Sequence, residues 1–132
     1  MPAKAPPLTL YGLASCDTCR AARKWLDDHD IRYRFHDLRA DGLEVQMLER
    51  WSDRIEWRKL VNTRSITYRR LPEVDRENMT WTRALATMLE HPTLVRRPVL
   101  EHRRFIAVGF QPAEYAAIFA RLGKTKSRDP GA

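Results

Sequence analysis

The chain has 132 residues, of which 43% are hydrophobic and 31% are charged, and its net charge is +7. This length predicts one domain with its own hydrophobic core, and the composition is that of a globular rather than a disordered protein. No apolar run approaches the roughly 20 residues that a membrane span requires, and the first seven residues lack the apolar segment of a secretory signal. We therefore expect a cytoplasmic protein that makes no membrane contact.

Arginine accounts for most of the positive charge, with 19 arginines against 5 lysines, scattered from Arg20 to Arg128. Such scattering is typical of a solvated basic surface, and it is also compatible with attraction to an anionic ligand or an acidic protein partner. No helix-turn-helix, zinc-finger or RNA-binding motif accompanies the charge, so we expect no direct contact with nucleic acid. Nothing in the sequence demands more than a monomer.

The first part of the chain predicts a strand, a helix and a second strand. Residues 8–13 (LTLYGL) form a short apolar run, and residues 31–37 (IRYRFHD) alternate between apolar and polar side chains. Between them, Ser15 or Asp17 can cap a helix of about four turns. One face of that helix carries Ala21, Ala22, Trp25, Leu26 and His29. A right-handed crossover would place the helix on one face of a parallel pair of strands.

The middle of the chain, residues 43–91, reads as a helical insert. Apolar side chains recur at helical spacing in residues 43–51 and 57–61, whereas residues 62–78 are polar and irregular. Thr80 can cap a further helix, which the His91–Pro92 pair would stop.

The last part of the chain predicts a β-hairpin and a closing helix. Residues 96–100 and 104–110 are two short apolar runs, and Pro112 can start a helix that Gly123 would end. The whole order predicts an α/β protein with the thioredoxin architecture: a four-stranded mixed sheet, helices on both faces and the insert beside it. We expect residues 8–122 to form this domain, with residues 1–7 and 123–132 as flexible ends.

Both cysteines of the chain lie at the start of the first predicted helix, as Cys16-Asp-Thr-Cys19. Unpaired N–H groups and the macrodipole at a helix N-terminus favour a thiolate, so Cys16 is the candidate nucleophile. Cys19 can resolve a mixed disulfide or can simply pack as a small buried side chain. Zinc would need two more ligands, and the histidines show no paired spacing for it, so we expect no metal site.

Several motifs in order resemble one known family. Residues 10–43 (LYGLASCDTCRAARKWLDDHDIRYRFHDLRADGL) look like the start of the ArsC-type proteins, which include arsenate reductases, Spx regulators and the YffB group. Residues 61–71 (VNTRSITYRRL), 90–100 (EHPTLVRRPVL) and 107–115 (AVGFQPAEY) match further along. The segment RYRFHDLRADGL looks closest to the YffB group, which has been suggested to be a glutathione-dependent thiol reductase.

The resemblance implies a reductase with Cys16 as nucleophile, glutathione as co-substrate and glutaredoxin as a further partner. It implies that Arg20 follows the cysteine in the anion-binding loop, and that Arg97 precedes a cis proline, Pro98. Arg64 matches the arginine of the middle segment approximately. We expect the three arginines to converge on Cys16, and the backbone before Pro98 to bind a peptide-like substrate such as glutathione.

Two alternatives stay open within this resemblance. In the arsenate reductases that this chain resembles, a third arginine would fall near residues 108–110, where this chain has none. Bound arsenate would therefore lack one of its stabilising cations. Spx proteins place a CxxC redox switch at the same position and bind the α-subunit of RNA polymerase. Cys16 and Cys19 satisfy that spacing, so a redox-switched binding protein is the alternative to an enzyme.

Overall fold

The computed structural model describes residues 8–127 of the chain, and the side chains of residues 8–122. Its centre is a four-stranded sheet in the order β2-β1-β3-β4. The strands are β1 (Leu8–Gly12), β2 (Arg34–Asp37), β3 (Val99–His102) and β4 (Phe105–Val108). Strand β1 pairs with β2 in parallel and with β3 antiparallel, which makes the sheet mixed, as the sequence predicted. Flexible ends were expected at residues 1–7 and 123–132; residues 1–7 and 128–132 lie outside the described residues, whereas residues 123–127 belong to a helix.

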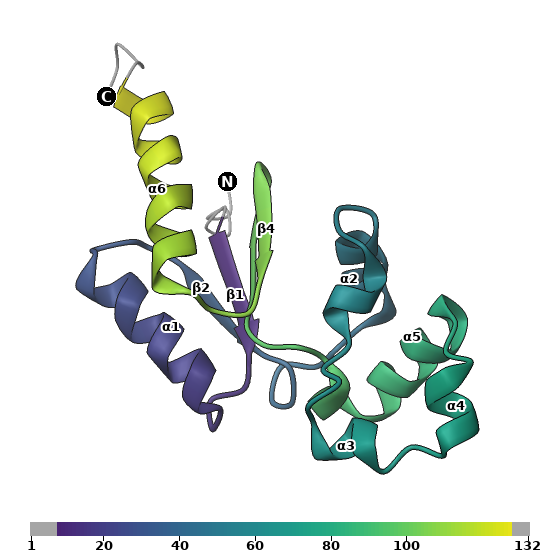
Figure 1. The fold of residues 1–132 in the computed structure, drawn as a ribbon. Helices are drawn as coiled ribbons and strands as arrows, with labels where there is room; N and C mark the ends of the chain where they lie inside the picture. Colours follow the sequence, from purple (N-terminus) through teal and green to yellow (C-terminus); the bar gives the residue numbers. More distant parts are fainter. Residues whose placement is uncertain (1–7, 128–132) are drawn as a thin grey trace.

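Two helices, α1 (Asp17–Asp28) and α6 (Pro112–Ser127), lie on one side of the sheet (Figure 1). The apolar side chains between these helices and the sheet form one core, because alternate residues of each strand point to the same face. Its buried members are Leu8, Leu10, Ala22, Leu26, Leu100, Ala107 and Tyr115.

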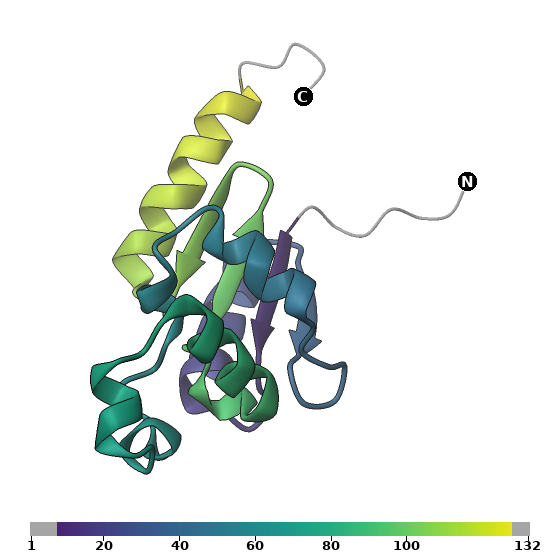
Figure 2. The ribbon, with the colours of Figure 1, turned by 90° about the vertical axis from the view of Figure 1, so that its right-hand side faces the viewer.

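The helical insert covers the opposite side of the sheet, as Figure 2 shows after a quarter turn. Its elements are α2 (Val45–Ser52), η1 (Trp57–Leu60), α3 (Ile66–Arg69), α4 (Glu73–Glu77), α5 (Trp81–Glu90) and η2 (Pro92–Leu94). A second core lies between insert and sheet, with Trp51, Leu60, Met88 and Val99 fully buried in it. Thr80 caps α5, since its hydroxyl accepts a hydrogen bond from the N–H of Arg83, as expected.

Three local predictions were wrong. Strand β2 begins at Arg34 rather than Ile31, because the chain first turns through Asp30, whose φ is 55°. Residues 62–78 contain the short helices α3 and α4, which are too short to show an amphipathic period. Helix α6 continues through Gly123 to Ser127, because a glycine weakens a helix by only about 1 kcal/mol and does not by itself stop it.

Candidate active site

The loop between β1 and α1 brings Cys16 to the start of a helix of 12 residues. Cys16 occupies the N-cap position, and neither Ser15 nor Asp17 caps the helix, contrary to expectation. The loop is held at two points: the N–H of Cys16 donates to the carbonyl of Leu13 at 3.0 Å, and the N–H of Ala14 donates to Asp37 at 2.9 Å. The sulfur of Cys16 is therefore presented at a fixed helix mouth, beside the N–H groups of the first turn.

The two thiols occupy different environments, although they are one helical turn apart. Cys19 is fully buried, whereas Cys16 is partly exposed, and both are free thiols. Gly12 makes room for Cys19: a β-carbon on Gly12 would overlap the sulfur of Cys19 and lie 3.2 Å from its Cβ atom. Cys16 is thus the thiol that a substrate can reach.

The surroundings separate the pKa values of the two thiols. Burial acts to raise the pKa of Cys16, but the backbone N–H and thiol of Cys19 and the guanidinium of Arg97 together lower it below its usual value. The pKa of Cys19 is raised to about 12. Burial is the largest cause, and the charge of Cys16 raises the pKa further. Cys16 is therefore the first of the two thiols to ionise as the pH rises, and Cys19 acts as its hydrogen-bond donor.

Arg97 approaches Cys16 from the segment before β3. Its guanidinium donates to the carbonyls of Thr93 (3.1 Å) and Val95 (3.0 Å), which fixes the side chain. Its Nε atom is buried and has no hydrogen-bond partner in the described part of the chain. A buried donor without a partner costs free energy, so Nε of Arg97 is available to donate a hydrogen bond to a thiolate or a bound anion.

The Arg97–Pro98 bond is cis, as predicted. The carbonyl of Pro98 accepts a hydrogen bond of 2.8 Å from the N–H of Gly109, so the turn after β4 lies against this segment. Residues 108–110 therefore lie next to Pro98, and none of them is an arginine.

Three arginines were predicted to converge on Cys16, and of these only Arg97 acts on its thiol. The guanidinium of Arg20 pairs with Asp17, and both side chains are largely exposed. Arg64 is also exposed, and its backbone N–H donates to the side chain of Asn62 at 3.1 Å. The backbone N–H of Arg20 donates to the carbonyl of Cys16 at 2.9 Å within the first turn of α1. Within the described residues, no side-chain hydrogen bond or ion pair joins Arg20 or Arg64 to Cys16, and a role for either guanidinium stays a prediction.

Asp37 is a site residue that the sequence reasoning missed. Its two carboxylate oxygens accept hydrogen bonds from the backbone N–H groups of Ala14, Arg39 and Ala40 at 2.8 to 2.9 Å. These bonds, that of Ala40 first, lower the pKa of the Asp37 carboxyl. The position of Asp37 at the end of a predicted parallel strand was a usable signal, because such ends meet the loop that follows the neighbouring strand.

Within residues 8–127, no group of three or more histidine, cysteine or acidic side chains is placed to hold a metal ion. No helix in the same range has the length and apolar character to cross a membrane. The site thus consists of a thiol pair, one guanidinium and the backbone of a helix mouth and a cis-proline turn.

The family model named ArsC family matches residues 11–118. The chain belongs to the ArsC family. An uncharacterized protein of Haemophilus influenzae is 41% identical over 113 residues, which are 86% of this chain and 99% of that protein. The global transcriptional regulator Spx of Listeria innocua is 29% identical over 122 residues, 89% of this chain and 91% of Spx.

Solved structures of ArsC relatives share this fold. The YFFB protein has a TM-score of 0.78 and 39% identity, and the match covers 83% of this chain and 96% of that one. An arsenate reductase (ArsC) related protein from Brucella melitensis has a TM-score of 0.72 and 42% identity, over 89% of this chain and 98% of that one. The chain therefore has the thioredoxin-like fold of the ArsC proteins, as the sequence predicted.

Proposed function

We propose that this ArsC-family protein is a thiol–disulfide reductase, with Cys16 as its nucleophile and glutathione as its thiol donor. The observation that carries the proposal is the separation of the two thiols. The pKa of Cys16 lies below its usual value at an open helix mouth, whereas that of Cys19 is raised to about 12 in the core. A low-pKa, accessible cysteine beside a cation is the arrangement that reactive cysteines share.

In the first step, the Cys16 thiolate attacks one sulfur of a glutathione mixed disulfide. A new bond forms between Cys16 and the glutathione sulfur, the old S–S bond breaks, and the substrate leaves as a thiolate that takes a proton from water. Cys16 and glutathione are then joined as a mixed disulfide, and the substrate has been reduced.

In the second step, a thiolate must attack this mixed disulfide and release Cys16. A thiol with a pKa of about 12 is ionised to only about one part in 100,000 at pH 7, and the main cause, burial, persists when Cys16 loses its charge. Free glutathione, with an ordinary thiol pKa, is ionised to about one per cent or more. A second glutathione is therefore the better attacking thiol: its thiolate bonds to the sulfur of the glutathione held on Cys16, the bond to Cys16 breaks, and oxidised glutathione leaves. Each cycle consumes one free glutathione, because the other half of the oxidised glutathione comes from the mixed disulfide itself.

The cis-proline segment would hold the glutathione. The backbone N–H of Arg97 makes no hydrogen bond within the described residues, so it is free to donate to a peptide-like ligand. The unpaired Nε of Arg97 can serve the thiolate or a glutathione carboxylate. Arg20 and Arg64, both exposed, would add positive charge for the same carboxylates, and glutaredoxin could reduce the glutathionylated protein in place of free glutathione.

Arsenate is a weaker substrate candidate in this proposal. A multiply charged oxyanion needs several converging cations, and Arg97 is the one guanidinium that acts on Cys16 in the described structure. We expect slow arsenate reduction or none.

The alternative function is an Spx-like redox switch that binds the α-subunit of RNA polymerase. It is favoured by the hydrogen bond between the Cys16 and Cys19 sulfurs, which are near enough to interact, and by the similarity to Spx. In this reading Cys19 would form an internal disulfide with Cys16, with the loss of two protons and two electrons to an oxidant such as a disulfide.

Mass spectrometry after exposure to oxidised glutathione distinguishes the two functions. For the reductase we expect the mass of one glutathione to be added at Cys16, in wild type and in Cys19→Ser alike, and reduced glutathione to remove it. Turnover of a glutathione mixed disulfide should be lost in Cys16→Ser and largely kept in Cys19→Ser. An internal disulfide in wild type, with no turnover, would instead favour the switch.

A further inference from the structure

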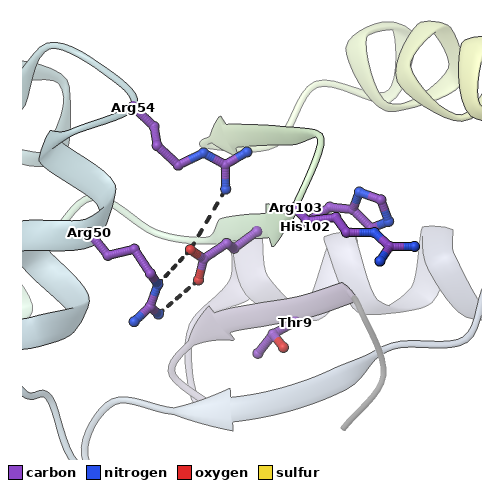
Figure 3. Close-up of a pocket in the computed structure, with 6 residues that line it drawn as sticks. Thr9, Arg50, Arg54, His102 and Arg103 are labelled. Carbon is purple, nitrogen blue, oxygen red and sulfur yellow. Dashed lines mark hydrogen bonds and ion pairs between the residues drawn. The ribbon is translucent and has the colours of Figure 1, made fainter. Parts of the chain in front are cut away.

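A charged cavity lies away from the thiols, between the insert and the sheet. It has a volume of about 420 Å³, within the range of small-molecule sites. The residues that line it are Thr9, Arg50, Arg54, Glu101, His102 and Arg103. Figure 3 shows Arg50 and Arg54 reaching in from the insert side, with Thr9 on the sheet and His102 and Arg103 at the end of a strand.

The cavity and the candidate active site are at opposite ends of β1. Thr9 is the second residue of that strand and pairs with Glu101, whereas Cys16 follows the strand after its last residue, Gly12. The charges of the cavity are therefore not part of the thiol site, and the proposed reductase function leaves them unexplained.

One of the three arginines is committed to the single acidic side chain of the lining. Arg50 donates to both carboxylate oxygens of Glu101, at 2.7 and 2.9 Å, and the indole N–H of Trp51 donates to the same group at 3.2 Å. Burial acts to raise the pKa of Glu101, but these contacts outweigh it and lower the pKa. The carboxylate is therefore ionised, and Arg50 balances its charge. The Arg50–Glu101 pair forms a fixed wall of the cavity.

The other two arginines keep most of their hydrogen-bonding capacity. Arg54 touches Glu101 through one nitrogen at 3.7 Å, which is too long for a hydrogen bond. Arg103, in the two-residue turn between β3 and β4, has no ion pair or side-chain hydrogen bond within the described part of the chain. The cavity therefore offers two guanidinium groups and the hydroxyl of Thr9 to a ligand.

The arginines in and beside the cavity affect the protonation of His102. Burial is the largest cause that lowers the pKa of His102, and Arg103, Arg104 and Arg54 lower it further. Nδ1 of His102 accepts a hydrogen bond from the backbone N–H of Arg104 at 3.1 Å, so the neutral ring carries its proton on Nε2. His102 can then donate a hydrogen bond without adding a charge.

We infer that this cavity binds the phosphate group of a small molecule, with Arg54 and Arg103 as its principal ligands. Two guanidinium groups that make no side-chain hydrogen bond, together with a hydroxyl, match the several acceptor oxygens and double charge of a phosphate ester, which arginine binds through its planar fork. A nucleic-acid backbone fits less well, because it needs a basic strip that follows many phosphates rather than a single hollow with two arginines. Inorganic phosphate and a phosphate monoester share this chemistry, and the test distinguishes them.

The test is titration of the reduced, 15N-labelled protein at constant ionic strength, followed by amide chemical shifts. The probes are inorganic phosphate, glycerol phosphate and, as a charged control, acetate. We expect the two phosphate probes to shift the amides of residues near Thr9 and residues 101–104, and acetate to leave them unchanged. Tighter binding of glycerol phosphate than of inorganic phosphate would identify an ester as the ligand, and the reverse order would identify the free ion.

Charge-matched variants show whether the cavity is responsible. We expect Arg54→Gln/Arg103→Gln to weaken binding by about tenfold or more, because two charge-assisted contacts are lost. The control Arg32→Gln/Arg69→Gln removes the same charge from two exposed sites and should change affinity by less than about twofold. Cys16→Ser and Arg97→Gln should bind as wild type does, and Arg54→Gln/Arg103→Gln should keep the alkylation rate of Cys16.

Three results would overturn the inference: no saturable phosphate binding, equal weakening in both double variants, or binding that is lost in Arg97→Gln and kept in Arg54→Gln/Arg103→Gln. Saturable binding of a DNA or RNA duplex, lost in the same cavity variant and much tighter than that of glycerol phosphate, would replace it with nucleic-acid binding. Because these tests do not measure disulfide reduction, they can fail while the proposed reductase function stands, and the converse also holds.

Discussion

The backbone N–H of Ala14, two residues before Cys16, donates a hydrogen bond of 2.9 Å to the Oδ2 atom of Asp37 at the end of β2. The other carboxylate oxygen of Asp37 accepts from Arg39 and Ala40. Asp37 is paired with Gly12 across β1 and β2, so a single side chain ties the thiol loop to the loop after β2. It positions the loop that carries Cys16 without touching the sulfur.

We expect Asp37→Asn to destabilise the protein by about 1–2 kcal/mol, because an amide has one acceptor oxygen where the carboxylate has two. Urea unfolding measures this loss, and Asp27→Asn, at an exposed position, is the control that should change stability by less than about 0.5 kcal/mol. The folded-state pKa of Asp37 is lowered, so its stabilisation is complete above the ordinary aspartate pKa and is lost as pH falls through the lowered value. Curves for wild type and Asp37→Asn should therefore converge in acid; a constant gap would contradict this role.

The sequence predicted the elements whose signals are local. The apolar run of β1, the cap at Thr80 and the CxxC at a helix start each need only neighbouring residues to be recognised. It failed where long-range packing decides: β2 begins only where Arg34 finds its partner Thr9, a pairing that no local pattern contains. The three arginines were grouped by resemblance, but Arg97 alone is held by carbonyls that point it toward Cys16, while Arg20 finds a nearer partner in Asp17.

Gly12 is predicted to be required for the packing of Cys19. We expect Gly12→Ala to destabilise the protein by about 1–3 kcal/mol, because the new methyl group would overlap the buried sulfur. In Cys19→Ala the sulfur is absent, so adding Gly12→Ala to that variant should cost clearly less. Urea unfolding of the four proteins gives the coupling between the two sites, and additive effects would show that the methyl group meets another obstacle.

Arg50 and Arg54 contact the same carboxylate with different geometry, which gives a matched pair of variants. We expect Arg50→Gln to cost about 1–2 kcal/mol, because it removes a bidentate contact from a Glu101 side chain that is only 12% exposed. Arg54→Gln should cost less than about 0.5 kcal/mol, since its contact is 3.7 Å long. Equal losses in thermal or urea unfolding would mean that charge, rather than geometry, stabilises Glu101.

The gap between wild type and Arg50→Gln should also depend on pH. The folded-state pKa of Glu101 is lowered in wild type, so the ion pair contributes fully above the ordinary glutamate pKa and is lost as pH falls through the lowered value. Stability measured from pH 7 down to about pH 3 should therefore show the two curves approaching one another. A gap that persists in acid would assign the loss to packing of the arginine stem.

Arg97 is predicted to set the reactivity of Cys16. Its hydrogen bond and charge are among the causes that lower the pKa of the Cys16 thiol, so Arg97→Gln should raise that pKa and slow alkylation by iodoacetamide several-fold at pH 7. The rate at high pH, where the thiol is ionised in every variant, should be nearly unchanged. Arg97→Lys should be intermediate, because an ammonium keeps the charge and loses the planar fork.

The experiment is a pH–rate profile of Cys16 alkylation in a Cys19→Ser background, where a single thiol reacts. Arg32→Gln, which removes the same charge from an exposed site, is the control and should leave the midpoint in place. A serine at position 19 can still donate a hydrogen bond to Cys16, so the background preserves the first turn of α1. If Arg97→Gln and Arg32→Gln gave the same profile as the parent, Arg97 would not activate Cys16, and the helix mouth and Cys19 would account for the lowered pKa by themselves.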